Sequence, residues 1–113
     1  MNTEKLNTIK EIRKVLNEVN PKIPTYAIGS DEREKLEQSA VELESLIWKL
    51  VNEDIKQTIN ELNVSKARLQ DIATELKNVN AELKEIGDKV EKASQILGAL
   101  VNIVLTASSA GLI

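Results

Sequence analysis

Residues 69–104 decide the fold class, and they read LQDIATELKNVNAELKEIGDKVEKASQILGALVNIV. Apolar residues recur at every seventh position of this stretch, in two series that are offset by three positions. The first series is Leu69, Leu76, Leu83, Val90, Leu97 and Val104, and the second is Ile72, Val79, Ile86, Ala93 and Leu100. Five consecutive heptads of this kind predict long amphipathic helices with a coiled-coil seam.

The helical pattern extends upstream, because no proline occurs between residues 30 and 105. The apolar positions that continue the stripe are Leu36, Ala40, Leu43, Ile47, Val51, Ile55 and Leu62. One unbroken helix over this range would be about 110 Å long at 1.5 Å per residue. We therefore favour a hairpin with helices at 30–62 and 65–106 and a turn near Asn63, and keep the unbroken rod as the alternative. At Gly87 we expect a mild kink.

The N-terminal part predicts a shorter helix followed by a loop. Residues 1–19 carry one apolar stripe, and residues 20–29 contain both prolines and Gly29. Ser30 and Asp31 open the next helix, with Asp31 and Glu34 spaced as a capping box. The stripe consists of Leu6, Ile9, Ile12, Leu16 and Val19. The prediction is an all-α, elongated helical bundle or hairpin that forms a single domain over residues 1–113.

Composition excludes several function classes. The chain has no His and no Cys and a net charge of −3. The usual zinc sites, thiol nucleophiles and Ser-His triads need those residues, and nucleic-acid binding favours a basic surface. The carboxylates of residues 31–37 and of Glu53, Asp54 and Glu61 are expected on solvated helix faces. We therefore expect no enzyme, no cofactor, no metal and no nucleic-acid partner.

The last 21 residues, 93–113, carry no charge. Their length is that of a membrane-spanning helix, but Gln95, Asn102 and Thr106 dilute the hydrophobicity. One interpretation buries this segment in a bundle core or an oligomer interface, and the other inserts it into a membrane. Its apolar residues are Ile96, Leu97, Val101, Ile103, Val104 and Leu105. Long amphipathic helices beside one uncharged element resemble the layout of helical pore-forming toxins, and this resemblance implies membrane activity.

Two functions follow as expectations. The first is a non-enzymatic interaction or scaffolding protein that forms a homo-oligomer, a dimer or tetramer, or binds another helical protein. Its association seam would be Leu69, Ile72, Leu76, Val79, Leu83, Ile86, Val90, Leu97, Leu100 and Val104. The second is a membrane-active protein that uses residues 93–113. Trp48 is expected at the core edge, or else as the anchor of a partner interface.

The first residues place positive charges without an apolar run behind them, so they do not match a secretory signal. We accordingly expect a cytoplasmic protein, with signal-independent export and membrane association left open.

Overall fold

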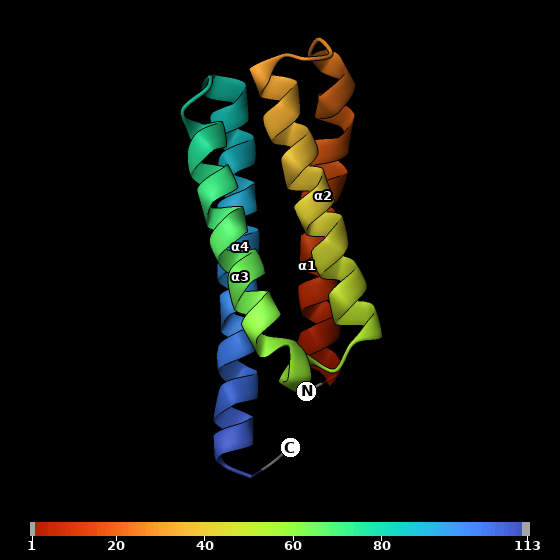
Figure 1. Ribbon diagram of the computed structural model, residues 1–113, viewed down its shortest axis with the longest axis vertical. Coiled ribbons are helices and arrows are strands. Elements are labelled where there is room, and N and C mark those ends of the chain that lie inside the picture. Colours follow the sequence, from red (N-terminus) through yellow and green to blue (C-terminus); the bar gives the residue numbers. More distant parts are fainter. Residues whose placement is uncertain (1, 112–113) are drawn as a thin grey trace.

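The computed structural model describes residues 2–111, and these residues form four α-helices and one short 3₁₀-helix, with no strand among them. The helices run up, down, up and down around one core (Figure 1) and measure 50 × 22 × 19 Å overall. They are α1 (Asn2–Val19), the 3₁₀-helix η1 (Asn20–Thr25), α2 (Asp31–Asn52), α3 (Ile55–Lys77) and α4 (Ala81–Ser109). The all-α prediction is confirmed, whereas the unbroken rod is wrong.

The turns between the long helices lie elsewhere than predicted. Asn63 is exposed in the middle of α3, so the expected turn there is wrong. One reversal occurs at Glu53 and Asp54, and a second separates α3 from α4 at residues 78–80. The Asp54 side chain accepts a hydrogen bond from the Lys56 amide at 3.0 Å, which caps the start of α3. The predicted helices 30–62 and 65–106 are therefore replaced by three helices with short connections.

Helices α1 and α2 pack with small departures from the predicted pattern. Ser30 caps α2 by accepting a hydrogen bond from the Arg33 amide at 3.2 Å. Two residues of the predicted stripes, Leu6 and Val51, lie on the outer surface. Leu46 and Leu50 are buried on α2, because the inward face of this helix keeps a heptad phase up to its last turn.

The heptad residues of α3 and α4 pack into the core of the same chain. Leu69 and Leu76 on α3 are fully buried, as are Leu83, Val90 and Leu97 on α4. α1 contacts α2 and α4, while α3 contacts α2 and α4, so each helix has two neighbours around the core. The apolar periodicity is thus satisfied by a four-helix bundle within one chain.

Small residues bring α3 and α4 close together. The Ser94 hydroxyl donates a hydrogen bond to the Lys66 carbonyl oxygen at 3.0 Å, and Gly87 lies against the backbone of Ala73. Helix α4 is continuous through Gly87, and the mild kink predicted there stays a prediction. The glycine allows the backbones of α4 and α3 to approach closely.

Candidate interaction surfaces

The predicted association seam is occupied within the chain. Its ten residues are buried, except Ile72 and Val79, which are partly buried and pack against the core. Leu100 and Val104 complete the core at the lower end of α4. In the folded bundle these side chains are inaccessible, so association between intact bundles has to use other residues.

The uncharged end of α4 divides between core and surface. Leu97, Val101 and Val104 face inward and are buried, and Ile96 is partly buried. Ile103 and Leu105 are 42% and 44% exposed, on a helix that extends past the ends of the others (Figure 1). A shallow hollow of about 410 Å³ lies on this end. We call its lining the α4-end surface: Asn102, Ile103, Thr106, Ala107 and Ala110.

A larger groove runs between α2 and α3, with a volume of about 680 Å³. Val41 and Ile72 contribute apolar surface, and five carboxylates outnumber one guanidinium along it. The Arg68 guanidinium lies 3.9 Å from the Glu42 carboxylate at one end. We call this the acidic groove, and its lining is Glu34, Glu37, Gln38, Val41, Glu42, Arg68, Asp71, Ile72 and Glu75. Sequence reasoning assigned residues 31–37 to a solvated helix start and missed the groove, because its second wall comes from α3.

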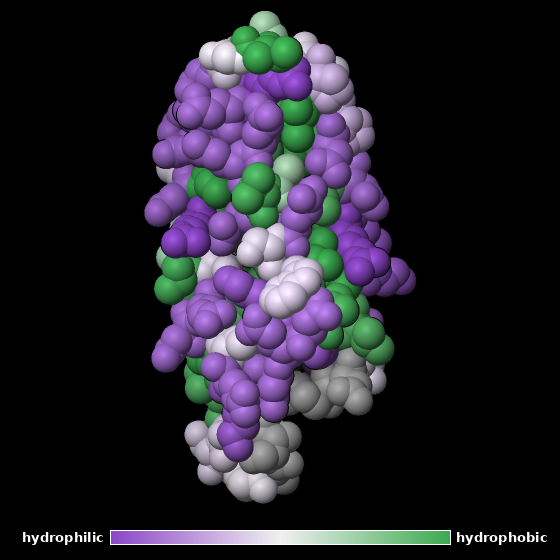
Figure 2. All heavy atoms as spheres, turned by 45° about the vertical axis from the view of Figure 1, so that its right-hand side comes forward, coloured by the Kyte–Doolittle hydropathy of each residue, from purple (hydrophilic) through white to green (hydrophobic). Residues whose placement is uncertain are grey.

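Trp48 lies on the outward face of α2 and is 58% exposed. This exposure exceeds what packing at a core edge would give. Its neighbour one turn later, Val51, is also exposed. Figure 2 brings the α1–α2 side forward and shows apolar side chains as separate islands within a largely hydrophilic surface.

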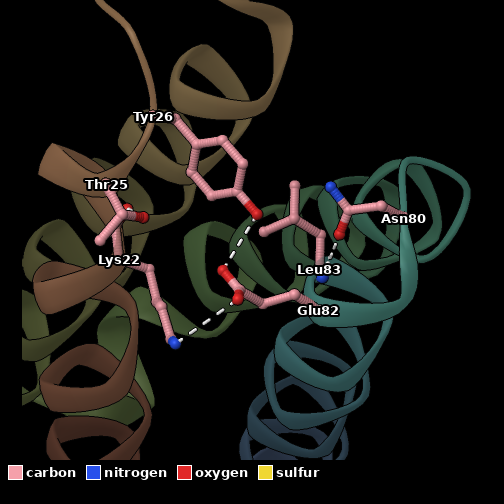
Figure 3. A network of polar contacts seen from close by, with 6 residues as sticks. All are labelled: Lys22, Thr25, Tyr26, Asn80, Glu82 and Leu83. Atoms are coloured by element: carbon pink, nitrogen blue, oxygen red, sulfur yellow. Dashed lines mark hydrogen bonds and ion pairs between the residues drawn. The ribbon is translucent and has the colours of Figure 1, made fainter.

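A polar network ties the proline loop to the start of α4 (Figure 3). The Tyr26 hydroxyl donates a hydrogen bond to Glu82 Oε1 at 3.0 Å, and Lys22 Nζ lies 3.8 Å from Glu82 Oε2. The Asn80 side chain accepts a hydrogen bond from the Leu83 amide at 2.9 Å and caps α4. Partial burial raises the pKa of Tyr26, and the neighbouring Glu82 carboxylate raises it further. These contacts tie the loop to the start of α4.

Other carboxylates serve as structural partners. Lys77 on α3 contacts Glu91 at 2.7 Å and Asp88 at 3.4 Å, and its hydrogen bond to Glu91 raises the pKa of its ammonium group. Asp31 pairs with Lys35 at 2.7 Å. Across residues 2–111, no group of three or more His, Cys, Asp or Glu side chains is arranged to hold a metal ion.

No family model, no curated protein and no solved structure matches this chain. Similarity to known proteins therefore gives no indication of function. The proposal below is based on the exposed surfaces of the bundle.

Proposed function

We propose that this chain is a non-enzymatic helical interaction protein that associates with a second copy through the α4-end surface. The observation that supports the proposal is the exposure of uncharged, mostly small or apolar side chains where α4 extends past the bundle. Such a surface is the kind that protein partners cover.

The spacing on this surface suits a second helix. Ile103, Ala107 and Ala110 follow one another at helical steps of four and three, so they form one stripe. The two alanines allow close approach of another helix backbone, and Ile103 supplies the apolar area. Full burial of an exposed isoleucine side chain contributes about 1.5–3 kcal/mol, and Ile103, which is 42% exposed, would gain about half of that or less. Two copies that pair their stripes would bury this residue twice, with no charge to desolvate.

The first test is the molar mass of the protein in solution across the micromolar range, by light scattering and sedimentation equilibrium. The proposal expects a reversible increase in mass, which Ile103→Asp reduces by raising the dissociation constant at least about tenfold. Val64→Asp is the matched control, because Val64 is an exposed β-branched residue on α3. A wild-type protein that stays monomeric overturns the proposal, as does an Ile103→Asp variant that associates like the control.

A second candidate function is membrane association through α4. This helix is long and apolar enough to cross a bilayer by length and composition, and 44% of its most apolar 18-residue window is buried in the bundle. Core helices pass the same test, so the exposed Ile103 and Leu105 are what favour this candidate. They would reach the lipid first.

Liposome co-flotation tests the membrane candidate with variants that leave the core intact. The informative changes are Ile103→Asp and Leu105→Asp, since both side chains are on the surface. Aspartate at Val101 or Val104 would break the core instead, because both residues are buried. Flotation of the wild type that both surface variants abolish supports membrane binding, whereas absence of flotation contradicts it.

A further inference from the structure

We propose that the acidic groove between α2 and α3 binds the outer face of α1 from a second copy of this chain. This inference goes beyond the association proposed above, because it uses different surfaces and does not require the α4-end surface. The two surfaces are complementary in charge and in the spacing of their residues along the helix.

The groove offers an apolar centre with acidic residues towards one end. Val41 is 65% exposed there, because it lies on the outward face of α2, opposite the residues that pack in the core. In the described part of the chain, Glu34, Asp71 and Glu75 have no ion-pair partner. Unpaired carboxylates beside an exposed valine favour a partner that brings both a cation and an apolar side chain.

The outer face of α1 supplies these groups. Leu6 is 64% exposed, and Lys10 and Arg13 follow it on the same side of the helix. Within residues 2–111, neither Lys10 nor Arg13 forms an ion pair. The face therefore carries an apolar group followed by two cations that have no ion-pair partner among the described residues.

The spacing of the two faces matches. On α1, the cations come four and seven residues after Leu6; on α2, Glu37 and Glu34 come four and seven residues before Val41. When Leu6 of one copy lies over Val41 of the other, Arg13 faces the unpaired Glu34. Lys10 then faces Glu37, whose carboxylate also lies 3.7 Å from Arg33 of its own helix. If α1 and α2 are antiparallel, both acid–base contacts form together. They lie about 6 Å and about 10 Å along the helix axis from the contact between Leu6 and Val41.

This pairing is head-to-tail. α1 contacts α2 and α4 but lies diagonally across from α3, so its outer face and the groove are on different sides of the bundle. In a pair of bundles lying side by side, the α1 face of one copy occupies the groove of the other. The groove of the first copy and the α1 face of the second therefore stay free. Such a heterologous interface adds further copies and forms rings or open chains.

The copies are parallel and staggered. α1 is antiparallel both to its own α2 and to the α2 that receives it, so all copies point the same way. Lys5 Nζ donates a hydrogen bond to the Glu53 carbonyl oxygen at 3.4 Å, which places the start of α1 level with the end of α2. Moving Leu6 to the level of Val41 therefore shifts the next copy by about eleven residues, or about 16 Å.

Charge reversal tests the pairing. The groove variant carries Glu37→Lys and Asp71→Lys, and the helix variant carries Lys10→Glu and Arg13→Glu. Either variant alone places like charges across the interface, so its apparent dissociation constant should rise at least about tenfold. An equimolar mixture restores opposite charges at both kinds of contact and should recover the mass of the wild type. Association of the wild type should also weaken with salt.

The control variant, Glu61→Lys with Glu85→Lys, makes the same change in net charge on exposed residues outside the groove. Circular dichroism of each variant establishes that the helices are retained. If the control variant weakens association as strongly as the groove variant, or if the mixture does not recover, the proposed pairing is overturned.

The same measurements separate this inference from the proposed α4-end association. Loss of association in Ile103→Asp alone, with both charge variants associating normally, overturns the groove pairing and leaves the proposed function standing. Loss in the charge variants alone, with recovery in the mixture, supports the groove and contradicts the α4-end surface. A wild-type protein that is monomeric at every concentration overturns both.

Discussion

Gly87 on α4 lies so close to Ala73 on α3 that a Cβ atom on Gly87 would be 2.8 Å from the Ala73 carbonyl oxygen. Lys77 is also near, with its backbone nitrogen at 3.1 Å from that position. Two backbones in contact leave no flexible group to move aside. The close packing of α3 and α4 at this level therefore requires glycine.

We predict that Gly87→Ala lowers the free energy of unfolding by about 1–2 kcal/mol, even though alanine favours helix by about 1 kcal/mol, because overpacking costs more. Gly98→Ala is the matched control. A Cβ there would meet the end of the Lys66 side chain at 3.0 Å, and that chain can move. This control should be stabilised by about 0.5–1 kcal/mol. Denaturant unfolding measures both, and equal effects would contradict the role given to Ala73.

The cap of α4 gives a second prediction. Asn80→Ala removes the acceptor for the Leu83 amide and should lower the free energy of unfolding by about 1 kcal/mol. Asn78→Ala is the control two residues away, since Asn78 contributes only backbone hydrogen bonds to this turn. Thermal unfolding followed by circular dichroism compares the two variants, and equal melting temperatures would argue against the cap.

The third prediction concerns pH. Tyr26 is the one tyrosine of the chain, so its phenolate absorbance reports a single group. Partial burial raises the pKa of Tyr26 above its ordinary value of 10.0, and the Glu82 carboxylate raises it further. A group whose pKa is higher in the folded state stabilises the fold below its unfolded pKa, and this contribution is lost as pH rises through the folded pKa.

The free energy of unfolding should therefore fall as pH rises past about 10. Glu82→Gln removes the nearby negative charge, so the phenol of this variant should ionise at lower pH than that of the wild type. Spectrophotometric titration measures both proteins. A variant that ionises at the same pH or higher would show that Glu82 does not influence Tyr26.

The fourth prediction distinguishes a core position from its neighbour on the surface. Leu83 is fully buried in the first turn of α4, so Leu83→Ala should lower the free energy of unfolding by about 2–5 kcal/mol. Lys84 is exposed, and Lys84→Ala should change the free energy of unfolding by less than about 0.5 kcal/mol. Denaturant unfolding at one protein concentration compares the two, and a mild Leu83→Ala would contradict the assigned core.

The helical class and the limits of α1 followed from the sequence because periodicity and proline are local signals. The two reversals did not, because they are short and lack both proline and glycine. Asp54 and Asn80 are the local signals that mark them, as side chains that cap the helices that follow. Asn63 resembled a turn only because it lies on the outer face of α3, where polar residues are tolerated.

The interaction surfaces were harder to foresee, for a physical reason. A heptad pattern indicates that one face of a helix is buried against other helices. The pattern is the same whether those helices belong to this chain or to another. The acidic groove joins Glu37 on α2 to Asp71 on α3, which are far apart along the chain.

Val79 keeps the heptad phase although it lies in the turn between α3 and α4. The heptad spacing of the apolar residues therefore continues without interruption from α3 through the turn into α4. If residues 78–80 were helical, these residues would line one face of a single long helix. Two chains with that helix could exchange α4 and recreate every α3–α4 contact between them, which is the geometry of a domain swap. The conformation of residues 78–80 thus decides whether this stripe closes within one molecule or links two.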